Sequence, residues 1–287
     1  EDEEEEEEEE ENQDDESVSD ENVESPNSME STFGEKELSP DSKEPLGWSG
    51  SLCPVRFVSG RSSIDSKTLE ITGLPSGGFS SVGTKGILLT SGKWYYEAEI
   101  QTAGCIQIGW ADSSFVGHCQ ADRGDGVGDG PSSWAFDGWR RYRWHSTPTE
   151  WGCRWAEGDV VGCLVDMDSM TISFTLNGKG EEIGMGLAYS GEGFRPCSGV
   201  YACVSFNRKE KIRLILGGEG TEPFKFSPPE GYRGVGEAIH DAVKERDSIM
   251  QNEEALGDSN LMIDSDGKRY MCDFSDGEHG HELFAWQ

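Results

Sequence analysis

The chain has 287 residues and a formal net charge of −32 at pH 7, with 56 acidic side chains against 24 basic ones. Such an acidic protein is a poor partner for nucleic acid and for anionic membrane surfaces, because both attract basic groups. The excess acid lies in residues 1–45 and 236–287, whereas residues 46–235 are nearly neutral. We therefore expect one packed domain in the middle. Because the chain begins at Glu1 rather than Met, we also expect a piece of a longer protein.

Residues 1–45 begin with eleven consecutive acidic residues and continue with serine, asparagine, aspartate and proline. Such a segment has too little apolar surface to offset the loss of backbone entropy, so its composition predicts disorder. Its role is open between a solubilising spacer and a docking tail for basic partners. Four serines in it stand before acidic residues or proline, a pattern typical of kinase substrates: Ser17, Ser19, Ser25 and Ser39.

Residues 46–235 read as a series of short strands. Apolar residues alternate with polar ones in 93–101, and residues 105–112 and 170–176 show the same period of two, which places Trp110 in the core. Residues 166–169 predict a hairpin turn, and the pair Asn177-Gly178 predicts another tight turn. Frequent turns and 38 glycines favour an all-β antiparallel sandwich over a parallel α/β sheet.

Residues 236–287 predict a short helix and a partial linker to a following domain. The helix is expected over residues 236–250, where Ile239, Val243, Arg246 and Met250 recur at helical spacing. After it, small apolar pieces at 261–263 and 283–286 look like the start of the next domain.

Three stretches suggest a metal or phosphate site, and each is better interpreted as a turn or a tail. GDGVGDG (124–130) has no lysine for a phosphate cradle, so glycine turn geometry is favoured over calcium bound by Asp122, Asp125 and Asp129. DSDGK (264–268) has a lysine where a calcium loop needs an oxygen ligand. The Cys and His residues of 272–282 lack a fourth zinc ligand. No cofactor or metal is therefore expected.

The eight cysteines and five histidines form no catalytic or metal-binding motif. There is no CxxC pair, and several cysteines lie in apolar runs such as VVGCLV (160–165) and YACVSF (201–206), as buried thiols do. We expect reduced, mostly buried cysteines and a cytoplasmic, reducing compartment. The absence of GxSxG and HExxH patterns predicts that this piece is not an enzyme.

Five blocks carry a resemblance to a known family: GKWYYEAEI (92–100), IQIGWAD (106–112), GDGVGDGPSSWAFDG (124–138), GDVVGCLVDMDSMTISFTLNG (158–178) and YACVSF (201–206). In this order and spacing they resemble the SPRY domain family, most closely the SPRY domains of giant ubiquitin ligases and ryanodine receptors. The resemblance implies a bent sandwich of two antiparallel sheets that binds a protein or peptide through loops at one edge. One departure is LILGGEG (214–220), which puts the geometry of the last strand in doubt.

The stretch WRRYRW (139–144) interleaves aromatic residues with arginines, as binding hot spots do. The alternative is that its aromatics cap the sandwich while its arginines pair with nearby acids. Together with the resemblance, this stretch predicts a peptide-binding face: Arg61, Phe115, Trp139, Arg141, Val200 and Tyr201. Tyr201 would supply a flat surface and Arg61 a forked donor, while Phe115 is an aromatic in a loop.

These observations predict a protein-recognition module that selects a substrate or partner within a large intracellular protein such as a ubiquitin ligase. The alternative is a module that docks within its own assembly, as in an intracellular channel. A concave pocket would favour the first function, and a flat polar loop face would favour the second.

Overall fold

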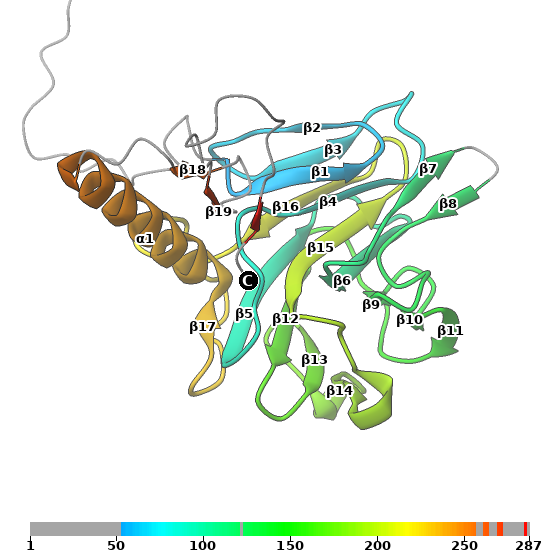
Figure 1. Ribbon diagram of the computed structural model, residues 1–287. Helices are drawn as coiled ribbons and strands as arrows, with labels where there is room; N and C mark the ends of the chain where they lie inside the picture. Colours follow the sequence, from blue (N-terminus) through cyan, green and yellow to red (C-terminus); the bar gives the residue numbers. More distant parts are fainter. Residues whose placement is uncertain (1–52, 121–122, 257–260, 264–268, 272–283, 286–287) are drawn as a thin grey trace, which may run out of the picture. The chain divides into compact units, whose positions relative to one another are not determined.

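The computed structural model describes residues 53–120, 123–256, 261–263, 269–271 and 284–285. The acidic segment with its four serines, the stretches 264–268 and 272–282, and Asp122 lie outside these residues. Figure 1 shows the described elements coloured along the chain. None of the described helices is both long enough and apolar enough to cross a membrane.

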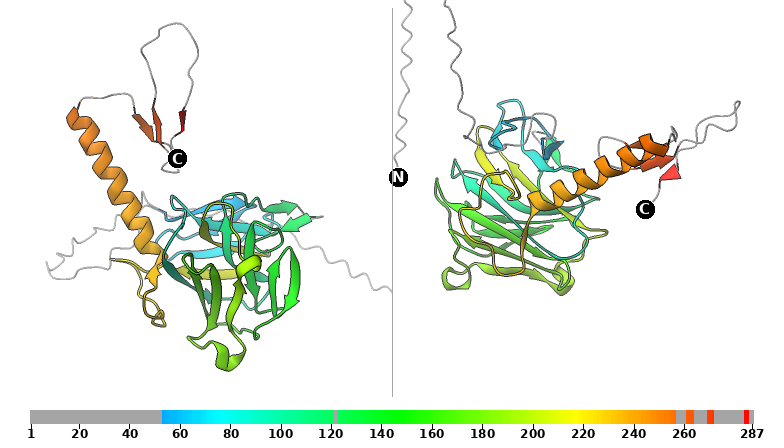
Figure 2. Two further views of the ribbon diagram at one scale, coloured as in Figure 1. Left: turned by 60° about the horizontal axis from the view of Figure 1, so that its bottom comes forward. Right: turned by 90° about the vertical axis from the view of Figure 1, so that its left-hand side faces the viewer.

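Two antiparallel sheets lie face to face and form the all-β sandwich that the sequence predicts (Figures 1 and 2). Sheet A has, in spatial order, β1 (Val55–Ser59), β4 (Ser80–Thr84), β15 (Val200–Phe206), β6 (Ile106–Asp112), β9 (Ser133–Asp137), β10 (Tyr142–His145) and β11 (Thr147–Glu150). Sheet B has β14 (Gly186–Ser190), β13 (Thr171–Leu176), β12 (Val160–Asp166), β5 (Lys93–Ile100), β16 (Lys211–Ile215), β3 (Glu70–Gly73) and β2 (Ser62–Ile64).

Shorter elements complete the described chain. A hairpin of β7 (His118–Gln120) and β8 (Arg123–Asp125) lies between β6 and β9, and the two-residue strand β17 (Arg233–Gly234) pairs in parallel with the start of β5. Two single 3-10 turns, η1 (Glu181–Ile183) and η2 (Gly191–Gly193), flank β14. A separate three-stranded sheet contains β18 (Leu261–Ile263), β19 (Arg269–Met271) and β20 (Phe284–Ala285).

The core lies between the two sheets, where alternate residues of each strand point inward. From β6 these are Ile106, Ile108 and Trp110, all fully buried. Tyr96 of β5 meets the Trp110 ring edge to face, with ring centroids 5.1 Å apart, and its hydroxyl donates to the carbonyl of Gly109 at 2.7 Å. The prediction that Trp110 belongs to the core is confirmed.

The two predicted turns are present and follow from local chemistry. The β12–β13 hairpin closes where one carboxylate oxygen of Asp166 accepts the backbone N–H groups of Asp168 and Ser169, at 3.0 and 2.9 Å. Asn177 and Gly178 both have positive φ, at 51° and 72°, as the central residues of a tight hairpin turn do. Both turns are therefore determined by residues adjacent in the sequence.

The outer face of sheet B is covered by the strap, defined here as residues 217–232, which follows the last long strand. Its anchor is Glu97, a fully buried outward residue of β5 that accepts hydrogen bonds from the backbone N–H groups of Lys225 and Phe226, at 2.7 and 2.8 Å. The Tyr95 hydroxyl donates to the same carboxylate at 2.9 Å, and the Tyr95 ring meets Phe224 edge to face. Burial raises the pKa of Glu97, while these hydrogen bonds oppose the shift.

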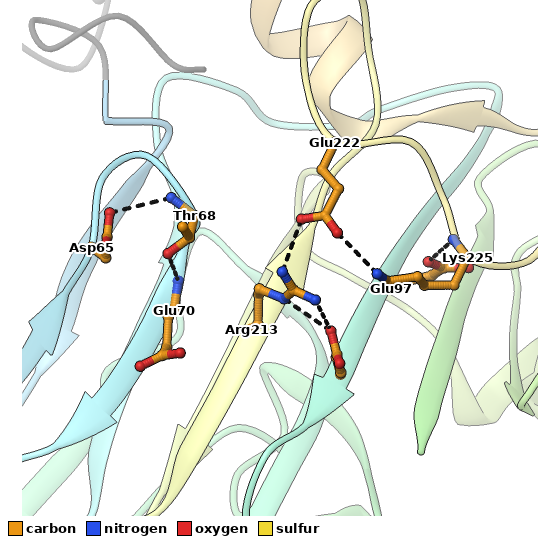
Figure 3. A network of polar contacts seen from close by, with 8 residues as sticks. Asp65, Thr68, Glu70, Glu97, Arg213, Glu222 and Lys225 are labelled. Carbon is orange, nitrogen blue, oxygen red and sulfur yellow. Dashed lines mark hydrogen bonds and ion pairs between the residues drawn. The ribbon is translucent and has the colours of Figure 1, made fainter. Parts of the chain in front are cut away.

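Ion pairs hold the strap beside this buried anchor. Glu222 pairs with Arg213 of β16 at 3.2 Å and with Lys225 at 3.0 Å, and Arg213 also pairs with Glu99 of β5. Figure 3 shows Glu222 between Arg213 and Lys225, with the Lys225 backbone against Glu97. The doubt that the LILGGEG departure raised about the last strand is resolved, because β16 runs regularly to Ile215 before Gly217 and Gly218 turn the chain, with positive φ, into the strap.

The helix α1 (Val235–Leu256) begins one residue before the predicted helix and extends six residues further. Its first turns pack on the sandwich through Val235 and Ile239, which are both in the core cluster. The cysteine prediction is only partly correct. The seven described cysteines are free, but only Cys163 and Cys203 are buried, and Cys197 is exposed.

Candidate functional site

The outer face of sheet A is covered by the connection between β6 and β9, which we call the crossover (residues 113–120 and 123–132). The strands place alternate residues on this face, among them Gln107 of β6, and Tyr201, Cys203 and Ser205 of β15. Because these residues alternate with core residues, both sides of sheet A are buried over part of its area. The crossover brings loop residues onto an otherwise solvated sheet.

A second, small apolar cluster joins the crossover to sheet A. Its members come from three strands and the crossover: Ala111, Phe115, Val127, Ala135, Tyr201 and Cys203. Phe115 is only 9% exposed, so its ring packs in this cluster and is not open to a ligand as the predicted peptide-binding face requires. The crossover folds back over the sheet and buries this ring, which a strand-by-strand analysis of the sequence does not consider.

The glycine-rich stretch 124–130 lies against sheet A, and at Gly126 it leaves no room for a side chain. A Cβ atom on Gly126 would stand 2.2 Å from the Phe79 ring and 2.6 Å from Ser205 Cβ. The Val127 N–H donates to Ser205 Oγ at 2.8 Å. Close approach, more than turn geometry, therefore explains the glycine at position 126.

Asp129 fixes the same stretch instead of offering a metal ligand. One carboxylate oxygen accepts the Gly126 N–H at 2.7 Å, and the other accepts Gln107 Nε2 at 2.8 Å. Burial raises the pKa of Asp129, against the effect of both hydrogen bonds. Among the residues that the structure describes, no group of three or more His, Cys, Asp and Glu side chains could hold a metal ion.

Beside this stretch lies a cavity of 390 Å³ that we call the sheet A cavity. Residues from the segment before β4, the crossover and the ends of β6, β10 and β15 line it. The lining residues used below are Phe79, Cys105, Gln107, Asp129, Arg140, Trp144 and Arg208. The cavity combines two aromatic rings with two arginines and two planar polar groups, the combination expected of a ligand site.

A stacked pair, Arg140 and Trp144, forms part of the cavity wall. The guanidinium carbon of Arg140 lies 4.4 Å from the Trp144 ring centroid, and Arg140 Nε donates to the buried carboxylate of Asp137. The Arg140 backbone N–H also donates to Asp137, at 3.0 Å. Burial raises the pKa of Asp137, and the ion pair with Arg140 opposes that shift. These contacts hold the guanidinium in place before any ligand arrives.

Three other lining groups define the chemistry of the cavity. Gln107 Oε1 is buried and has no hydrogen-bond partner among the described residues, so it is an unused acceptor. Arg208 is exposed and makes no ion pair within the described part of the chain. Burial raises the pKa of the Cys105 thiol to about 11, so this thiol is neutral and unreactive at neutral pH.

The structure does not bring the predicted peptide-binding residues together. Val200 is fully buried and Tyr201 is 4% exposed, with its ring under the Arg56 guanidinium at 5.3 Å. Arg61 is exposed, and its backbone is fixed by two hydrogen bonds with Ser80 Oγ. Tyr201 is therefore not the open flat surface that the sequence suggested, and Arg61 lies outside the lining of the sheet A cavity.

Trp139 and Arg141, the other two predicted residues, are exposed and also lie outside this lining. Trp139 is 45% exposed, and Arg141 pairs with Glu150 of β11 at 3.5 Å. Two other residues of the arginine-aromatic stretch 139–144, Arg140 and Trp144, line the sheet A cavity. Phe79, Gln107 and Arg208 have no signal in the sequence, because only the fold brings them together.

The comparisons with known proteins agree with this fold. Residues 93–219 match the profile of the SPRY domain family. A stretch of 148 residues, 51% of this chain, is 35% identical to the E3 ubiquitin-protein ligase RKP of Arabidopsis thaliana and covers 11% of that ligase. SPRY domains generally act as protein-interaction modules. The segment 93–219, which contributes most of the sheet A cavity, is therefore a SPRY domain.

Proposed function

We propose that this SPRY domain binds a segment of a partner protein in the sheet A cavity. The observation that carries the proposal is the Arg140–Trp144 stack, which Asp137 holds in the wall of a 390 Å³ cavity. Arg140 and Arg208 offer donors to a carboxylate, and the rings of Phe79 and Trp144 offer flat apolar surfaces. The segment that suits this lining carries an acidic residue next to an apolar one.

The wider role that we propose is substrate recognition within a large cytoplasmic protein such as a ubiquitin ligase. The similarity to an E3 ubiquitin ligase supports this role, although the aligned stretch covers only 11% of that protein. The concave cavity favours recognition of a peptide segment over docking of a flat loop face within the same assembly. On this proposal, any catalytic step belongs to other parts of the larger protein.

The test is a selection from a displayed peptide library against the 287-residue chain, followed by calorimetric titration of the selected peptides. We expect the peptides to share an acidic residue beside an apolar one. Arg208→Ala should weaken binding at least tenfold, about 1.4 kcal/mol, without changing the melting temperature. Arg61→Ala is the matched control, since Arg61 is an exposed arginine outside the cavity lining.

The opposite result would overturn the proposal. If Arg61→Ala abolishes binding while Arg208→Ala binds normally, the ligand occupies the loop edge near Arg61. Peptides that bind both variants as tightly as the wild type would place the ligand elsewhere on the sandwich.

A further inference from the structure

A second cavity, of 550 Å³, lies between the strap and helix α1, and we call it the helix cavity. Four carboxylates, two cationic side chains, one histidine and the ring of Phe224 line it. None of these residues lines the sheet A cavity. A ligand here would therefore be independent of the proposed peptide site.

The walls of the helix cavity are held together by backbone contact. The Gly236 N–H donates to the Leu216 carbonyl at 2.8 Å. A Cβ atom on Gly236 would stand 1.8 Å from the Gly217 carbonyl oxygen, so only glycine allows the start of α1 to lie this close to the strap. The buried side chains of Val235 and Ile239 fix the same helical turns to the sandwich. The cavity is consequently a preformed feature.

Two of the four carboxylates are already fully used. Both oxygens of Glu222 are paired, one with Arg213 and one with Lys225. Glu237 accepts from Arg233 at 3.1 Å with one oxygen and from the Gly234 N–H at 3.0 Å with the other. These two groups shape the wall and have little left to offer a ligand.

The remaining carboxylates keep free oxygen atoms. Asp241 uses one oxygen for Arg233, at 2.9 Å, and its other oxygen makes no hydrogen bond or ion pair with the residues that the structure describes. Glu219 is exposed and makes no hydrogen bond or ion pair within the described part of the chain. Lys244 is the one lining cation that lacks such a partner there. By charge, the four carboxylates that line this cavity outnumber its two cationic side chains.

We propose that the helix cavity binds a lysine or arginine side chain from a segment of a partner protein. The cationic head would lie between Glu219 and the free oxygen of Asp241, with the Phe224 ring beside it as a cation–π surface. Lys244 would oppose this ligand through like-charge repulsion. Because both walls contribute, the ligand would also bridge the strap and the helix.

Because Glu219 and Lys244 carry opposite charges, removing one charge or the other should change the affinity for a basic peptide in opposite directions. The probe is the tripeptide acetyl-Lys-Arg-Lys-amide, titrated into the ¹⁵N-labelled 287-residue chain, with acetyl-Glu-Asp-Glu-amide as the reversed-charge control. We expect saturable shifts of the Gly217 and Gly218 amide signals with the basic peptide only. Glu219→Gln should weaken the binding that these signals report about threefold, and Lys244→Gln should strengthen it about threefold, as for an exposed ion pair.

Residues 1–45 will attract the same basic peptide, but neither substitution touches them, so the Gly217 and Gly218 signals isolate the cavity. The proposal fails if both variants titrate like the wild type, if the acidic peptide produces the same shifts, or if Lys244→Gln weakens binding. If any of these results is obtained while the sheet A cavity still selects the expected peptides, only the helix cavity proposal fails and the peptide site remains supported. If the peptide test of the sheet A cavity fails but the basic tripeptide titrates as expected, the helix cavity proposal remains supported.

Discussion

The two outer faces of the sandwich are both covered, but in different ways. On sheet B, the strap covers Glu97, and three donors satisfy this buried carboxylate. On sheet A, the crossover covers Gln107, whose Oε1 has no partner among the described residues, and a 390 Å³ cavity remains beside it. The contact of the strap with Glu97 is complete in its hydrogen bonding, whereas the contact of the crossover with Gln107 leaves one acceptor unused.

This difference concerns the two buried polar contacts, Glu97 under the strap and Gln107 under the crossover. Burial of a polar group is costly unless its hydrogen bonds are made, so a fully satisfied contact such as that of Glu97 stabilises the fold. An unsatisfied buried group such as Gln107 Oε1 lowers stability unless another group completes its hydrogen bonds. We therefore assign the peptide site to sheet A, whereas the contact of the strap with Glu97 is structural and the helix cavity is a separate site between the strap and α1.

The largest expected effect on stability comes from the core between the two sheets, which lies beneath both the strap and the crossover. Trp110→Ala should lower the free energy of unfolding by about 3–5 kcal/mol, because it leaves a cavity between the sheets. Trp139→Ala is the control, since that ring is 45% exposed, and it should change stability by less than about 0.5 kcal/mol. Urea denaturation measures both values, and a near-normal midpoint for Trp110→Ala would contradict its core position.

The next effect tests the complete cover on sheet B. Glu97→Leu leaves three donors without an acceptor and should cost about 3 kcal/mol in unfolding free energy. Glu99→Leu, two residues along the same strand, removes only a partly exposed ion pair with Arg213 and should cost about 1 kcal/mol or less. Equal losses in the two variants would show that the buried anchor is no stronger than its exposed neighbour.

A smaller effect tests the close approach of the crossover on sheet A. Gly126→Ala should cost about 1–3 kcal/mol, because its Cβ would overlap Phe79 and Ser205. Gly130→Ala lies in the same stretch, where a Cβ meets no atom within 4 Å, and should be nearly neutral. Since Phe79 lines the sheet A cavity, Gly126→Ala should also weaken the selected peptides, whereas Gly130→Ala should not.

The smallest effect compares the buried Glu97 with the half-buried Asp129 through the pH dependence of stability. Burial raises the pKa of Glu97 above its ordinary 4.5, and that of Asp129 above 3.8. The folded state then holds these protons to a higher pH than the unfolded chain. The free energy of unfolding should therefore fall as pH rises from each ordinary value through the raised one. Glu97→Gln and Asp129→Asn should each flatten this slope in chemical denaturation between pH 4 and 7, and an unchanged slope would contradict the raised pKa.

The sequence predicts features that adjacent residues determine and fails where distant segments meet. The turn at Asn177-Gly178 and the inward face of β6 follow from local pattern alone. The burial of Phe115 and Tyr201 depends on a crossover that folds back over the sheet, so the local sequence pattern does not predict it. Alternation of apolar and polar residues identifies the face of a strand that lies in the core. It carries no information about whether a distant segment covers the opposite face.

The candidate site shows the same limit. Arg140 and Trp144 were detectable as a pattern because their contact spans one turn between β9 and β10. Gln107 and Asp129 are 22 positions apart, and their hydrogen bond depends on the crossover lying flat. Arg208 comes from the far end of β15. No spacing in the sequence relates these three residues, so only the fold could identify the cavity.

The short strand β17 sets the order in which the molecule would yield to a mechanical load. It pairs with Trp94 and Tyr95, at the end of β5 that β16 leaves open, and Arg233 lies over the Trp94 ring at 5.1 Å. A pull on α1 therefore acts first on the core contacts of Val235 and Ile239 and on this two-residue pairing, and only afterwards on the long strands. The junction behaves as a weak link in series with a strong sandwich, so tension from the C-terminal side would detach the helix while the sheet A cavity keeps its shape.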